Sequence, residues 1–135
     1  MNFGIVILFF GLPFASSMLR RLPVPACRAT GITAYCHNIK FDSYRIEAAM
    51  NKAMEIYRNF LPESRAKENL FYIGHSAENG HEFCYPLTMT KKEIKKTPGI
   101  QAYVYFNQVC RFMTVMEMFT NGQFPTHTDC DITRN

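Results

Sequence analysis

The residues of this chain best suited to chemistry lie in the stretch HSAENGHEFCY, from His75 to Tyr85. Imidazole, carboxylate and thiol groups can act as general acids and bases, as nucleophiles and as metal ligands. The Asn79-Gly80 dipeptide predicts a two-residue hairpin, and in that register His75 faces Cys84 across the strand pair. A packed cross-strand pair is favoured over a metal-binding pair because no third ligand is in view, so we expect no metal ion and no cofactor.

A basic run and two tyrosines suggest a second chemistry, the binding of a polyanion. The only dense basic run in the sequence consists of Lys91, Lys92, Lys95 and Lys96. A solvated surface is the plainer interpretation of this run, and contact with phosphate groups is the more specific one. Tyr103 and Tyr105 share one face of a predicted strand and offer rings on which bases can stack, although ordinary sheet packing is favoured. The formal net charge of +4 is compatible with an anionic partner without requiring one.

The N-terminal segment has the pattern of a secretory signal peptide. It reads MNFGIVILFFGLPFASS, an apolar run that becomes small and polar at Ser16 and Ser17, so residues 1–17 are assigned to the signal. A membrane anchor is disfavoured because a bilayer span takes about 20 apolar residues and Pro13 interrupts this run. Residues 18–33 lack periodicity, which predicts an extended arm ahead of one domain at 34–135. We expect a secreted protein with no membrane attachment after cleavage.

The five cysteines of a secreted chain would pass through an oxidising compartment, where disulfides persist. Cys36 and Cys130 lie near the two ends of the predicted domain, and a bridge between them would close nearly the whole domain into one loop. The odd count leaves at least one thiol free or paired with another chain. Cys84 and Cys110 lie in apolar, strand-like sequence, where a buried free cysteine is the commoner outcome, and the pairing of Cys27 stays open.

One segment has the periodicity of an amphipathic helix. Apolar residues recur at spacings of three and four from Tyr44 to Phe60, with polar residues between them. Asp42 or Ser43 can cap the start of this helix, and Pro62 stops it. The sequence therefore predicts a single N-terminal helix.

After this helix the hydrophobic period changes to two. The predicted strands are 70–73, 81–87, 100–107 and 109–118, and Asn121-Gly122 ends the last of them. Between the second and third strands, Thr90 and Glu93 have the spacing of a capping box that opens a short helical turn. We therefore expect an α+β fold in which the N-terminal helix packs on a four- to five-stranded antiparallel sheet.

This order of elements resembles that of the small secreted guanyl-specific ribonucleases of fungi. Their pattern is a Cys, a helix, a strand with an aromatic-Pro-Leu/Ile triplet, a strand ending in Val-x-Phe-Asn, another strand and a second Cys. The matching pieces here are Cys36, the helix from Tyr44, Tyr85-Pro86-Leu87, Val104-Tyr105-Phe106-Asn107 and Cys130. The resemblance covers about residues 34–130 and implies a microbial-ribonuclease-like fold.

The catalytic residues of that family have no counterparts in this chain. RNA cleavage by transphosphorylation needs a base for the ribose 2′-OH, an acid for the leaving oxygen and a cation for the phosphorane. The family's glutamate precedes the aromatic-Pro-Leu triplet, where this chain has Cys84, and its arginine position holds Tyr103. Its two histidines correspond to positions within 115–118 and 70–73, which contain no histidine here. A thiol with an ordinary pKa of about 8.5 is mostly protonated at neutral pH, so we expect a pseudo-ribonuclease.

Secreted, ribonuclease-like chains without catalytic residues resemble the RNase-like effectors of cereal powdery mildew fungi. Those effectors carry an aromatic-x-Cys motif soon after the signal peptide, which Tyr35-Cys36 approximates without the intervening residue. They act inside plant cells, and some are avirulence factors detected by intracellular immune receptors. The resemblance implies a monomeric, non-catalytic effector in the host cytoplasm that binds a host protein, RNA without sequence preference, or both.

Two other classes of function stay open. A divergent active ribonuclease would use Glu82 or Glu117 together with His75 or His81. A toxin-like or structural extracellular protein would never enter a cell. The first alternative predicts RNA cleavage, and the second predicts no effect of the protein when it is expressed in the host cytosol.

Overall fold

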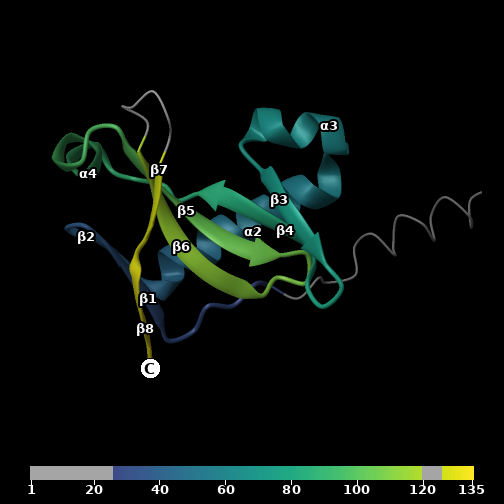
Figure 1. Cartoon of the computed structure of the whole chain (residues 1–135), viewed down its shortest axis with the longest axis horizontal. Coiled ribbons are helices and arrows are strands. Elements are labelled where there is room, and N and C mark those ends of the chain that lie inside the picture. The colour runs from purple at the N-terminus through teal and green to yellow at the C-terminus, as the bar shows by residue number, and fades with distance from the viewer. Residues whose placement is uncertain (1–25, 120–125) are drawn as a thin grey trace, which may run out of the picture.

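The computed structural model describes residues 26–119 and 126–135 of the chain. The expected signal peptide at 1–17, most of the expected arm at 18–33 and the strand end at Asn121-Gly122 lie outside these residues. Within them the fold is α+β, as predicted, with a long helix behind a twisted antiparallel sheet (Figure 1). The elements in chain order are β1 (Ile32–Cys36), β2 (Ile39–Phe41), α2 (Ser43–Asn59), α3 (Pro62–Arg65), η1 (Ala66–Glu68), β3 (Phe71–Ser76), β4 (Gly80–Pro86), α4 (Lys91–Lys96), β5 (Ile100–Asn107), β6 (Phe112–Phe119), β7 (Thr126–Asp129) and β8 (Asp131–Arg134).

The strands form two sheets, of which the sequence predicted only the larger. The larger sheet has five antiparallel strands in the order β3-β4-β5-β6-β7, in agreement with the expected four to five. The smaller sheet has the order β2-β1-β8 and joins the two ends of the domain. Because β1 and β2 precede α2, the long helix is not the first element of the fold, as the sequence analysis had placed it.

Helix α2 forms where the apolar periodicity predicted a helix. Asp42 is its N-cap, and its side chain accepts a hydrogen bond from the Arg45 main-chain N at 2.9 Å. The apolar stripe of the helix is buried, including Ile46, Met50 and Ala53, and it belongs to one core with Phe83, Val104 and Phe106 of the sheet. Burial of this stripe fixes the face of β4 and β5 that points toward the helix, so the alternate residues point away from it.

The β3–β4 hairpin differs from the two-residue turn predicted at Asn79-Gly80. Ser76 pairs with Gly80, which has a φ of +67°, and three residues form the turn between them. The Ser76 hydroxyl accepts a hydrogen bond from the Asn79 main-chain N at 2.9 Å, which stabilises the longer turn. As a result His75 faces His81, and the prediction that His75 faces Cys84 is wrong.

The loop between β5 and β6 is longer than the tight Asn107-Gln108 turn that the sequence suggested. The Asn107 side-chain Oδ1 accepts hydrogen bonds from the main-chain N atoms of Val109 and Arg111 at 3.1 and 2.9 Å. These bonds organise a turn, so β6 begins at Phe112 rather than at Val109. Cys110 adopts a φ of +68° in this turn and is therefore not part of a strand.

Two disulfides join segments that lie far apart in the described chain. Cys36 is bonded to Cys130, and Cys27 is bonded to Cys110. The expectation that Cys110 is a buried free cysteine is wrong, whereas Cys84 is free and buried. Cys27 and Ala29 are each 2 % exposed, so these two residues of the expected arm belong to the folded core. Two disulfides are consistent with a secreted protein.

Candidate nucleic-acid interface

The first part of the candidate interface is the sheet face opposite α2, which we call the open face. The residues of β5 that point toward the helix are buried, and they are Ala102, Val104 and Phe106. Tyr103 and Tyr105 alternate with these residues and therefore point to the open face. Burial raises the pKa of both tyrosines, so the phenols stay neutral at physiological pH. Two neutral, partly exposed rings on one strand can stack with bases.

Cys84 lies on the open face between Phe71 of β3 and Tyr105 of β5. The residue is 5 % exposed, and burial raises the pKa of the thiol to about 11, although a hydrogen bond with Tyr105 acts in the opposite direction. The thiol is therefore protonated at neutral pH. A protonated, buried thiol serves neither as a general base nor as a nucleophile.

The residues considered for a divergent active site do not come together around Glu82. Glu82 points to the open face, and its Oε2 accepts a hydrogen bond from the Asn79 side chain at 3.1 Å. The rings of His75 and His81 lie opposite each other with centroids 5.1 Å apart, and His81 also contacts Phe83. Phe83 is buried in the core on the helix side, so these imidazoles lie on the face opposite Glu82.

Glu117 has a histidine partner that sequence reasoning missed. It is buried on the helix side of β6, and one of its oxygens lies 2.7 Å from Nδ1 of His37, within hydrogen-bond distance. The His37 side chain is 44 % exposed in the turn between β1 and β2, whereas the Glu117 side chain is 4 % exposed. His37 and Glu117 are 80 positions apart. The one sequence feature that could have indicated a partner was Glu117 itself, a carboxylate on the apolar face of a predicted strand.

The second part of the candidate interface is α4, which carries the four predicted lysines. The capping box is present: the Thr90 hydroxyl accepts a hydrogen bond from the Glu93 main-chain N, and the Glu93 carboxylate accepts one from the Thr90 main-chain N. Lys91, Lys92, Lys95 and Lys96 are all exposed. None of them forms an ion pair with an acidic side chain among the residues that the structure describes. They present free positive charge along one short helix.

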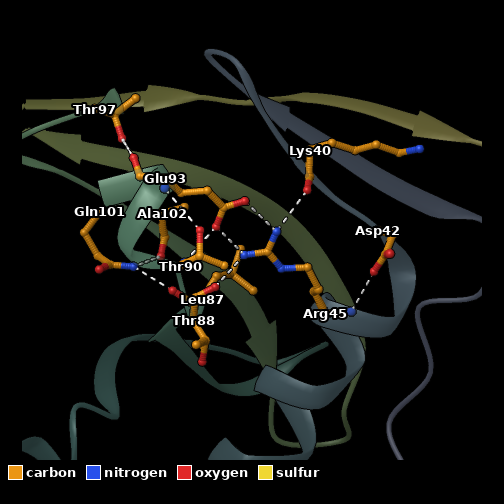
Figure 2. Close-up of polar contacts among 10 residues, drawn as sticks. All are labelled: Lys40, Asp42, Arg45, Leu87, Thr88, Thr90, Glu93, Thr97, Gln101 and Ala102. Carbon is orange, nitrogen blue, oxygen red and sulfur yellow. Dashed lines mark hydrogen bonds and ion pairs between the residues drawn. The ribbon is translucent and has the colours of Figure 1, made fainter. Parts of the chain in front are cut away.

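A partly exposed ion pair connects α4, the lysine helix, to α2 (Figure 2). The Arg45 guanidinium donates to both carboxylate oxygens of Glu93, at 2.9 and 2.8 Å. It also donates to the main-chain O atoms of Thr88 and Lys40, at 2.6 and 3.2 Å. The Arg45 hydrogen bonds hold the pKa of Glu93 down at about 2, and Glu93 in turn raises the pKa of Arg45. This bidentate pair fixes the position of α4 although 48 residues separate its members, so no local pattern indicated it.

A cavity of about 340 Å³ lies beside α4, between α2 and the end of β4, and it was not predicted. Tyr44, Lys52 and Tyr85 line it together with Thr90, the N-cap of α4. The cavity therefore reaches the start of α4, and its walls contain cationic and aromatic side chains. Tyr85 pairs with Val104, which points toward the helix, so the cavity lies on the other side of the sheet from Tyr103 and Tyr105.

The described residues contain no group of three or more His, Cys, Asp or Glu side chains that could hold a metal ion. In the same part of the chain no helix is both long and apolar enough to cross a bilayer. Compared with protein-family models, curated proteins and solved structures, the chain shows no significant match.

Proposed function

We propose that this chain is a non-catalytic, RNase-like secreted effector of a cereal powdery mildew fungus, a binding module that acts in the cytoplasm of the plant host cell. The observation that carries the proposal is the state of Cys84, a buried thiol with a pKa of about 11. It stands at the position where the ribonucleases that the sequence resembles have their general base. The α+β architecture and the Cys36–Cys130 disulfide support a ribonuclease-like scaffold.

The proposal includes two kinds of partner. One is RNA, bound without sequence preference. The other is a host protein, for example an intracellular immune receptor. Four exposed lysines without acidic partners in the described residues support contact with a phosphate backbone. The tyrosines of the open face add rings for base stacking. We propose that the protein acts as a monomer, and that a host protein recognises the same exposed surfaces.

The runner-up function is a divergent active ribonuclease. It needs a carboxylate and an imidazole on one surface, within reach of one ribose and its phosphate. Glu82 lies on the face opposite His75 and His81, and Glu117 is 3 % exposed and paired with His37. This arrangement favours the binding module, and the two functions differ in whether RNA is cut.

The test is to incubate the chain from residue 18 onward with a fluorescent RNA and to follow cleavage and anisotropy in one sample over a salt series. The proposal expects intact RNA and salt-sensitive binding. Products ending in 2′,3′-cyclic phosphate that disappear in a Glu82→Gln or Glu117→Gln variant would replace it with the enzyme. If the RNA is neither cut nor bound, the host protein is the remaining proposed partner.

Charge reversal locates the RNA surface. In a Lys91→Glu/Lys92→Glu variant, the loss of two phosphate contacts should weaken binding and lower the salt slope by about 1.4, at about 0.7 per contact for single strands. A matched control is Lys40→Glu/Lys67→Glu, which changes two exposed lysines outside α4 by the same charge. Equal loss in both variants would indicate attraction by net charge alone and would contradict a site at α4.

A further inference from the structure

A second cavity, of about 530 Å³, opens between α3 and the β3–β4 hairpin, and we call it the α3 pocket. None of the lysines and tyrosines of the candidate interface lines it. Its apolar walls include Leu70, Phe71, Tyr72 and Phe83, and its polar side chains are Arg65 and His81. A cavity of this size and composition suits a small organic molecule.

The aromatic walls of the α3 pocket hold one another in place. The rings of Tyr72 and His81 meet edge to face, with centroids 5.5 Å apart at an angle of 88°. The Phe83 ring contacts both of these rings, with centroid distances of 6.3 Å. Phe83 is 2 % exposed, so packing in the core holds it in place. Tyr72 and Phe71 are 59 % and 38 % exposed, which is high for large apolar side chains on neighbouring residues. A planar ring that entered the pocket would cover this surface and gain edge or stacking contacts.

Arg65 gives the pocket a fixed and uncompensated positive charge. Its guanidinium lies over the Tyr57 ring, 4.3 Å from the centroid, and donates to the Tyr57 main-chain O at 3.0 Å. Its Nε is buried and has no acceptor, and no acidic side chain pairs with it, within residues 26–119 and 126–135. Arg45, the comparable arginine at the lysine helix, is neutralised by Glu93. A guanidinium held in this way is suited to bind an anionic group.

We propose that the α3 pocket binds a small planar aromatic molecule that carries one anionic group. The ring of the ligand lies against Tyr72, His81 and Phe83, and its anionic group is paired with Arg65. The site is independent of RNA binding, because it shares no residue with α4 or with Tyr103 and Tyr105. The two proposals can therefore fail separately.

The test uses naphthalene sulfonate as the probe and naphthalene sulfonamide as its neutral match. The chain has four histidines, whose ring resonances can be followed by NMR during each titration. We expect the sulfonate to shift the resonances of His81 and its neighbour His75, and to leave those of His37 and His127 unchanged. Because a hydrogen bond to a charged group is lost, the sulfonamide should bind about tenfold or more weakly. Equal affinity of the two probes, shifts at His37 or His127 instead, or no binding would overturn the proposal.

Two variants with matched controls assign the contacts. Arg65→Gln should weaken sulfonate binding about tenfold and leave sulfonamide binding unchanged, whereas Arg58→Gln, at an exposed arginine outside the pocket, should change neither. Arg65 also contacts Tyr57, so its replacement removes a structural contact as well as the charge. A second variant, at Tyr72, therefore tests the pocket without changing Arg65. Tyr72→Ser should weaken both probes about threefold to tenfold, and Tyr35→Ser, at a tyrosine 42 % exposed in β1, should not. Unchanged affinity in a folded Arg65→Gln and in Tyr72→Ser would refute the site.

Discussion

The ion pair that anchors the lysine helix predicts how the stability of the protein depends on pH. Arg45 hydrogen bonds lower the pKa of Glu93 from its ordinary value of 4.5 to about 2. A difference of about 2.5 pH units corresponds to about 3 kcal/mol of preference for the ionised form in the folded state. This figure is an upper bound, because the Arg45 and Glu93 side chains are 27 % and 19 % exposed and water screens their attraction. We therefore expect Glu93→Gln to lower the free energy of unfolding at neutral pH by about 1–2 kcal/mol.

The sign of the pH dependence follows from the depressed pKa. A carboxylate whose pKa is lower in the folded state stabilises the fold above its unfolded pKa, near 4.5, and this stabilisation is lost as the pH falls toward about 2. The stability difference between the wild type and Glu93→Gln should therefore be constant above about pH 6 and vanish near pH 2. At about 4 °C per kcal/mol, the variant should melt about 4–8 °C lower at neutral pH.

Thermal unfolding followed by circular dichroism from pH 7 to pH 2 measures this difference directly. Glu63→Gln is the matched control, since Glu63 is exposed and forms no ion pair within the described residues. Its melting temperature should follow that of the wild type at every pH. If Glu93→Gln and the wild type instead lose stability in parallel between pH 5 and pH 2, the pair with Arg45 does not exist in solution.

Three further predictions concern the disulfides, the free thiol and the buried carboxylate. Replacing the Cys36–Cys130 bridge by two serines should lower the free energy of unfolding by about 4 kcal/mol, because the bridge spans 94 residues; a melting curve unchanged by the replacement would contradict this. Cys84 should react with iodoacetamide in the native protein orders of magnitude more slowly than a free cysteine at neutral pH, as measured by mass spectrometry. His37→Ala leaves the Glu117 carboxylate without its partner and should cost about 1–3 kcal/mol, part of which a second change, Glu117→Gln, should restore; a single variant as stable as the wild type would refute the pairing.

The elements that could be predicted from the sequence are those determined by neighbouring residues. The Asp42 cap, the apolar stripe of α2, the Thr90–Glu93 capping box and the alternation in β5 each depend on residues a few positions apart. The prediction of a two-residue turn at Asn79-Gly80 was wrong because Gly80 pairs with Ser76, and the turn between them has three residues. The hydrogen bond from the Asn79 main-chain N to the Ser76 hydroxyl stabilises this longer turn. A shift of register changes which side chains face each other, so a small error in the turn gave the wrong partner for His75.

The contacts that define the candidate surfaces could not be predicted, because each joins residues far apart in the chain. Cys27 and Cys110 are 83 residues apart, and Arg45 and Glu93 are 48 apart. The strands of the smaller sheet are three to five residues long, too short for a periodic signal. The α3 pocket brings Arg65 of α3 beside His81 and Phe83 of β4, and its aromatic residues read locally as ordinary strand residues.

The environment of Cys84 and Tyr103 on the open face favours neutral side chains at both positions. They lie on the same face of adjacent strands, where burial raises the pKa of both side chains. A carboxylate at the position of Cys84 would be almost fully buried beside Phe71 and Tyr105, and without a nearby cation its ionised form would cost several kcal/mol. With Tyr103 rather than a cation on the neighbouring strand, a neutral residue at position 84 is the arrangement that the fold tolerates.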